Sequence, residues 1–163
     1  MRSVLALVVA AVVAMLLQTT VFAAIPRFPV VPNLMLVLAV YLGVRHQGAG
    51  GVVGAFLLGY FLDTFSGTVL GLHAFALTVV YAAVYLIARN LWMRGRLPVM
   101  VVVFLAACLG ELALFVLGAL VAAGSPLWQH VGRYGLVEAA VTALVAPVVF
   151  AFVNRERELL GLS

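Results

Sequence analysis

Three acidic residues lie in or beside long apolar stretches of this sequence, where a charge is costly to hold: Asp63, Glu111 and Glu138. An ionisable group inside a membrane segment marks a site of proton or ion movement, or a polar contact between buried helices. His73 adds a second titratable group near Asp63. The chemistry open to these residues is therefore proton transfer, ion binding or structural hydrogen bonding.

Each acid has a functional and a structural interpretation. Asp63 either binds the amide groups of a turn and so fixes a bend, or contacts a partner. For Glu111 we favour a protonated carboxyl group bonded to a neighbouring helix over a transported-proton site. For Glu138 an ion pair with a cation such as Arg133 is an alternative. Counted from the outer surface, one polar layer is expected to contain Arg27, Asp63, His73, His130 and Arg133, with Glu138 somewhat deeper.

The residue patterns of common enzymes are absent from the sequence. The chain has no lysine for a phosphate-binding loop, no His-Glu-x-x-His, no Gly-x-Ser-x-Gly, and only one cysteine, Cys108. The histidines lack metal-ligand spacing. We therefore expect no enzymatic activity, no metal and no cofactor; an intramembrane enzyme using Glu111 or Glu138 is the weakest alternative.

Composition indicates the elements that must position these residues. The sequence is 67% hydrophobic and 9% charged, whereas soluble domains have about 45–50% and 25%. Its 163 residues allow about six spans of roughly 20 residues. We predict one all-α integral membrane domain, a six-helix transmembrane bundle with spans at about 4–25, 32–44, 48–62, 70–88, 98–122 and 129–153.

The predicted spans differ in length. The second and third spans are short, which implies either a locally thinned bundle or helices shielded from lipid by their neighbours. A cleaved signal peptide is the alternative for the first span, although its length favours a retained helix.

A hairpin of small residues is the most informative stretch. Four residues recur at a spacing of four and share one helix face: Gly51, Ala55, Gly59 and Asp63. A second series of small residues follows on the next helix: Gly67, Gly71, Ala74, Thr78 and Ala82. Small residues let helices approach closely in lipid. We predict a tightly packed hairpin whose bend, centred on Asp63, lies at a membrane surface.

Arginine placement predicts the orientation in the membrane. All nine basic residues are arginine, and with the N-terminus inside, seven lie in inner segments and two, Arg27 and Arg133, in outer ones. The positive-inside rule then places both termini in the cytoplasm. We assign the basic charge to topology and predict no nucleic-acid binding.

The chain resembles the bacterial rod shape-determining protein MreD family over its whole length, most clearly from about Pro32 to Leu77. The residues that carry the likeness are Pro32-Asn33-Leu34, Val40-Tyr41-Leu42, Arg45, Gly54, Leu58-Gly59, Leu62-Asp63, Ser66-Gly67, Leu70-Gly71-Leu72-His73 and Leu77. The family often has an acid after the first proline, where this chain has Asn33.

The resemblance implies a non-catalytic protein of the bacterial cytoplasmic membrane. Such proteins are members of the rod complex, or elongasome, which controls cell shape and lateral peptidoglycan synthesis. The implied partners are an MreC-like single-span protein, a wall-elongation glycosyltransferase and transpeptidase, the MreB filament and the lipid bilayer. The implied fold is similar to the substrate-binding subunits of energy-coupling-factor vitamin transporters.

Two functional hypotheses follow. In the first, the face formed by Gly51, Ala55, Gly59 and Asp63 contacts the transmembrane helix of MreC, or holds the bend that does. In the alternative, the chain is a substrate-binding subunit of a vitamin transporter, with an outward cavity near Asp63, His73 and Glu138.

Overall fold

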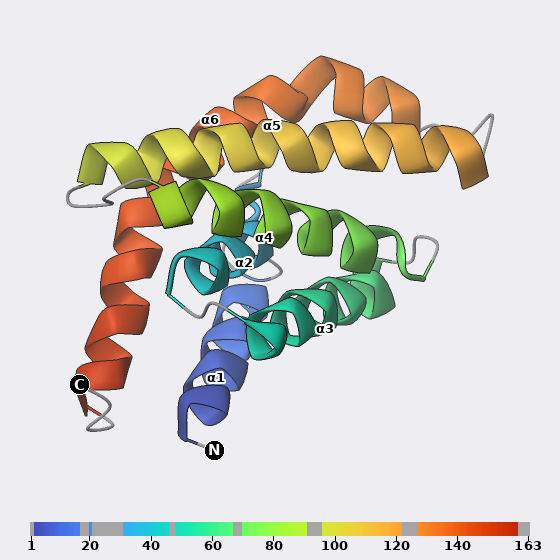
Figure 1. Cartoon of the computed structure of the whole chain (residues 1–163). Coiled ribbons are helices and arrows are strands. Elements are labelled where there is room, and N and C mark those ends of the chain that lie inside the picture. Colours follow the sequence, from blue (N-terminus) through green and yellow to red (C-terminus); the bar gives the residue numbers. More distant parts are fainter. Residues whose placement is uncertain are drawn as a thin grey trace.

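All regular secondary structure that the structure describes is helical. The computed structural model describes residues 2–16, 20, 31–45, 48–66, 70–90, 96–121 and 127–159. Its helices are α1 (Arg2–Leu16), α2 (Leu34–Arg45), α3 (Ala49–Ser66), α4 (Leu72–Asn90), α5 (Arg96–Val121) and α6 (Leu127–Leu159), as Figure 1 shows. The predicted all-α architecture is confirmed.

Helices α3 and α6 extend furthest beyond the ends of the predicted spans. Helix α3 continues to Ser66 instead of ending before Asp63, because the Asp63 side chain is satisfied by hydrogen bonds and does not have to break the helix. Helix α6 continues to Leu159 instead of Val153, because its last residues include arginine, glutamate and leucine, which favour helix even outside an apolar environment. Most of residues 17–25, the end of the first predicted span, lies outside the described residues.

The outer surface of the bundle fits a lipid environment. Three described segments are long and apolar enough to cross a membrane, namely Leu72–Arg89, Leu97–Leu120 and Gly135–Arg155, whereas α2 and α3 are apolar but shorter. Large apolar side chains are exposed on the long helices, for example Leu120 of α5 at 78% and Leu136 of α6 at 74%. So many exposed large apolar side chains are unusual on a soluble monomer. The chain is a membrane protein.

Helix α2 forms the centre of the bundle. Residues 34–43 are all buried, and α2 packs against each of the other five helices. A helix whose side chains are buried by neighbouring helices does not need to match the thickness of the lipid. For α2, the structure therefore supports shielding by neighbours as the reason for its short length.

The other five helices form an incomplete ring around α2. Neighbouring pairs pack closely from α3 to α4, α4 to α5, α5 to α6 and α6 to α1. Helices α1 and α3 both pack on α2, but α1 and α3 do not pack closely on each other. The ring is therefore open on one side, between α1 and α3.

Helix α6 bends, and its C-terminal part is anchored to α2. Pro147 lies inside α6, and Figure 1 shows the helix changing direction sharply towards its red C-terminal part. Proline removes a backbone hydrogen bond and kinks a helix. Beyond the bend, Tyr41 of α2 donates a hydrogen bond to Asn154 Oδ1 at 3.0 Å. The Tyr41 ring also packs edge-on against Phe150, with centroids 5.1 Å apart.

The start of α2 is fixed by its own cap and by α6. The Asn33 side-chain oxygen accepts the Leu36 N–H at 3.0 Å, the usual N-cap arrangement. The Asn33 N–H donates to the Thr142 hydroxyl oxygen at 3.0 Å. Thr142 is fully buried in α6. This bond ties the first turn of the central helix to the middle of α6.

We expect Thr142→Val to lower the free energy of unfolding by about 1–2 kcal/mol, since the Asn33 N–H loses its acceptor while the shape of the side chain is kept. Thermal unfolding of the protein in detergent, followed by circular dichroism, measures the change. Thr78→Val is the matched control because the Thr78 hydroxyl bonds only the Ala74 carbonyl of its own helix. Equal effects of the two substitutions would contradict a role for Thr142 in joining α6 to α2.

Candidate functional site

The small-residue face of α3 packs against α4. Gly51, Ala55, Gly59 and Asp63 are all buried, and α3 and α4 form one of the most extensive helix contacts of the bundle. The approach is closest at Gly59, where an added Cβ would lie 2.6 Å from the Ala74 amide nitrogen and 2.5 Å from the His73 carbonyl oxygen. Only glycine fits at this crossing. In this structure, therefore, the face is occupied by the chain's own α4.

Asp63 joins the end of α3 to the beginning of α4. Its side chain is fully buried and accepts backbone N–H groups from Gly71 at 2.9 Å, His73 at 3.1 Å and Ala74 at 3.2 Å. The first N–H groups of a helix have no partner within the helix. Asp63 thus acts as an N-terminal cap for α4, although it belongs to α3.

His73 supplies a further contact to the same carboxylate. Its Nδ1 lies 2.7 Å from Asp63 Oδ1, and 18% of the His73 side chain is exposed. Each carboxylate oxygen of Asp63 therefore has two donors. All four of these donors belong to the chain itself, so the arrangement holds a hairpin together.

Gly71 has a conformational role that its spacing did not reveal. It precedes α4, and its φ of +97° lies in the region that favours glycine. An added Cβ at Gly71 would meet no atom within 4 Å, so close packing is not what requires glycine here. This backbone conformation accompanies the bond from the Gly71 N–H to Asp63. Gly67, the first member of the same predicted series, lies outside the described residues.

Glu111 and Glu138 lie between the other pair of helices, α5 and α6. A Cβ added to Gly135 of α6 would be 3.5 Å from Glu111 Oε2, so the Glu111 side chain of α5 packs against α6 at this glycine. Glu111 and Glu138 interact electrostatically, and both are partly buried. Helix α3 packs on α2 and α4 and makes no close contact with α5 or α6. These two acids therefore form a group separate from Asp63.

Of the predicted polar layer, the structure brings together Asp63 and His73. Arg27 lies outside the described residues, as do the side chains of His130 and Arg133. Among the described residues, no three His, Cys, Asp or Glu side chains are grouped in a way that could hold a metal ion.

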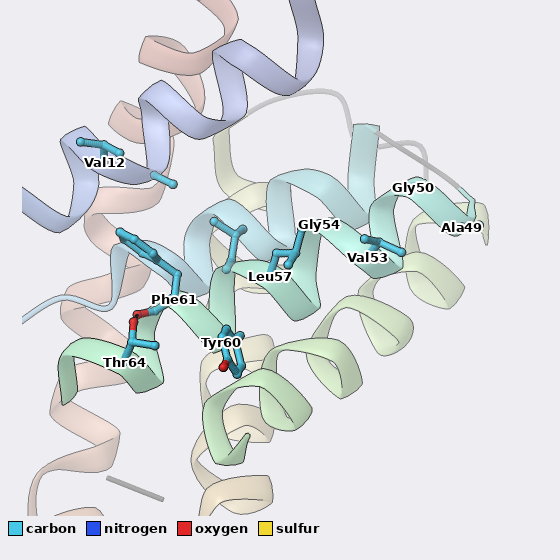
Figure 2. A pocket seen from close by; sticks show the side chains of 11 residues that line it. Val12, Ala49, Gly50, Val53, Gly54, Leu57, Tyr60, Phe61 and Thr64 are labelled. Carbon is cyan, nitrogen blue, oxygen red and sulfur yellow. Dashed lines mark hydrogen bonds between the residues drawn. The ribbon is translucent and has the colours of Figure 1, made fainter. Parts of the chain in front are cut away.

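The structure also contains an apolar groove on the other side of α3, which the residue pattern did not predict. The groove has a volume of about 690 Å³ and lies between α1 and α3. Figure 2 shows its wall along α3, from Ala49 and Gly50 past Val53 and Leu57 to Phe61 and Thr64, with Val12 of α1 opposite. One signal was present in the sequence, because Gly50 and Gly54 are also four residues apart and define a second small face.

Comparison with known proteins gives one match. A family model described as rod shape-determining protein MreD matches residues 1–156, which confirms the predicted family. No curated protein and no solved structure matches the chain significantly.

Proposed function

The chain belongs to the MreD family of rod shape-determining proteins, and we propose that it acts as a non-catalytic membrane scaffold of the cell-elongation complex. It binds an MreC-like single-span protein, and through this contact it controls the wall glycosyltransferase and transpeptidase. The MreB filament is a further partner, direct or indirect.

The arrangement of Asp63 is the observation that carries this proposal. A buried carboxylate used for transport or catalysis needs an oxygen that can accept a hydrogen bond from a substrate or a proton from a transport path. Asp63 instead has donors from its own chain on both oxygens. Its position at the junction of α3 and α4 favours a structural role, in which it keeps the hairpin in one shape for a partner to bind.

The outer faces of this hairpin suit contact with a transmembrane helix. Phe56 of α3 and Phe75 of α4 are about half exposed, and the Phe56 ring stacks on Tyr60 with centroids 6.4 Å apart. Aromatic side chains give large contact areas at low entropic cost. In the proposed complex, Asp63 and Gly59 position these faces and do not touch the partner themselves.

The proposed location is the bacterial cytoplasmic membrane with both termini in the cytoplasm. Support comes from exposed arginines at or near the C-terminal ends of α2, α4 and α6: Arg45, Arg89 and Arg155. Consecutive spans run in opposite directions, so these three ends lie on one side of the membrane. Helix α3 begins just after Arg45, on the same side of the membrane. Asp63, near the C-terminal end of α3, then lies at the outer surface.

The vitamin-transport alternative gains no support from the described residues. The groove found there is apolar and lies between α1 and α3, away from the contact between α3 and α4 that contains Asp63 and His73. Asp63 also has no acceptor position left for a polar solute.

Co-purification with the MreC-like protein tests the proposed function. We expect Asp63→Ala to reduce the yield of the complex at least fivefold and to turn rods into rounded cells, because loss of the cap loosens the hairpin. The yield is measured by affinity capture from membranes at equal expression, and cell shape by microscopy of cells that carry only the variant.

Thr64→Ala is the neighbouring control, since Thr64 is exposed and its hydroxyl bonds only the Phe61 carbonyl of the same helix. It should leave the complex and the rod shape intact. If Asp63→Ala cells keep both a normal yield of complex and a normal shape, the proposed function of the hairpin is wrong.

A further inference from the structure

The groove between α1 and α3 is the gap in the ring of helices around α2. Its wall on α3 extends from Ala49 to Thr64, a length of about 22 Å at the helical rise of about 1.5 Å per residue. Nearly all of its lining surface is apolar. Gly50 leaves open space there, because an added Cβ would meet no atom within 4 Å.

The lining of the groove suits a hydrocarbon chain. Nearly all of it is apolar, and it lies on helices of a membrane protein, where acyl chains surround the apolar surface. An extended acyl chain brings no polar group that the groove would leave without a partner.

A positive charge lies at one end of the groove. Arg45 ends α2 and is exposed, and Ala49, which follows it by four residues, begins the wall of the groove. The structure describes the side chains of three acids, Asp63, Glu111 and Glu138. Asp63 contacts His73 at the other end of α3, and none of the three is paired with Arg45. An arginine at the end of a membrane helix lies at the depth of the lipid headgroups.

We propose that this groove is a binding site for an anionic phospholipid, with one acyl chain between α1 and α3 and the phosphate at Arg45. A guanidinium group binds phosphate oxygens through two parallel hydrogen bonds, and an additional net negative charge on the headgroup strengthens the attraction. The bound chain completes the apolar packing of α3 where none of the described helices covers it. This lipid site goes beyond the proposed scaffold function and does not depend on it.

Native mass spectrometry of the purified full chain tests the site. The protein in detergent is offered equal amounts of dioleoyl phosphatidylglycerol and dioleoyl phosphatidylcholine. We expect wild type to retain one lipid with a preference for phosphatidylglycerol, and Arg45→Gln to lower that preference about fivefold. Val53→Trp, which fills the groove, should lower retention of both lipids about tenfold, as expected if two or more methylene groups lose their contacts.

The chain offers a matched control for each substitution. Arg89→Gln removes an exposed arginine from the last turn of α4, which does not line the groove. Val101→Trp changes a valine of α5 that is 57% exposed, against 55% for Val53. Both controls should retain lipid as wild type does.

Three results would overturn the proposal. The first is that wild type shows no preference between the two headgroups, and the second is that Arg45→Gln and Arg89→Gln lower the preference for phosphatidylglycerol equally. The third is that Val53→Trp retains lipid as wild type does but no longer binds the MreC-like partner. The last result would assign the groove to a protein helix. Lipid retention is measured without any partner protein. A negative result for the lipid site therefore does not contradict the proposed scaffold function, which co-purification tests separately.

Discussion

Gly59→Ala is expected to separate α3 from α4 and to lower the free energy of unfolding by about 3 kcal/mol or more. The added methyl group would overlap the backbone of His73 and Ala74. Backbone atoms cannot rotate away as a side chain can, so one helix must move. In lipid, association of these helices depends on close packing, because water does not drive it. Thermal unfolding in detergent measures the loss.

The same substitution at Gly50 is the control for helix propensity. Gly50 also lies in α3, but an added Cβ there meets no atom within 4 Å. Gly50→Ala should therefore leave stability within about 0.5 kcal/mol of wild type or raise it slightly. If Gly59→Ala and Gly50→Ala unfold alike, the close approach at Gly59 does not hold the hairpin together.

Asp63→Ala is expected to lower the free energy of unfolding by about 3 kcal/mol, since several buried donors lose their acceptor at once. The first turn of α4 should fray, because the N–H groups of Gly71, His73 and Ala74 have no other partner in the helix. Hydrogen exchange at these three amides, measured by mass spectrometry or nuclear magnetic resonance, should accelerate relative to the middle of α4.

Asp63→Asn separates the roles of charge and shape. The amide keeps one acceptor oxygen but turns an NH₂ group towards donors, so its stability should lie between those of wild type and Asp63→Ala. His73→Phe should cost about 1 kcal/mol, because it removes one donor and leaves the three backbone bonds in place. A loss with His73→Phe as large as that with Asp63→Ala would show that the ion pair, and not the cap, joins the helices.

Much of the fold followed from local patterns. Long apolar runs with few charges predicted helices. Pro98, as a helix-start residue, and Gly124, as a turn residue, predicted the ends of α5 within a few residues. Helices α3 and α6 continue past the predicted spans for a common reason. A polar residue was taken as the limit of a helix, whereas helices continue wherever a polar group finds a partner, as Asp63 does, or where good helix formers lie at a surface.

The burial of small residues could be predicted only in part. Helix α3 carries two series of small residues one position apart, one with Gly51, Ala55 and Gly59 and one with Gly50 and Gly54. Periodicity describes both as contact faces. The first packs on α4 and the second lines the groove, because α4 packs on one side of α3, whereas the described part of α1 does not pack closely on the other.

The sequence by itself determined the class of the protein, its helical content, its family and the fact that Asp63 must face protein, since these depend on composition and on spacing along one helix. The tertiary structure decided which side chains meet. Asp63 and His73 are ten residues apart and Asn33 and Thr142 are 109 apart. Contacts at these separations depend on how helices cross, which periodicity within a helix does not specify. The same reason explains the central position of α2 and the open side of the ring.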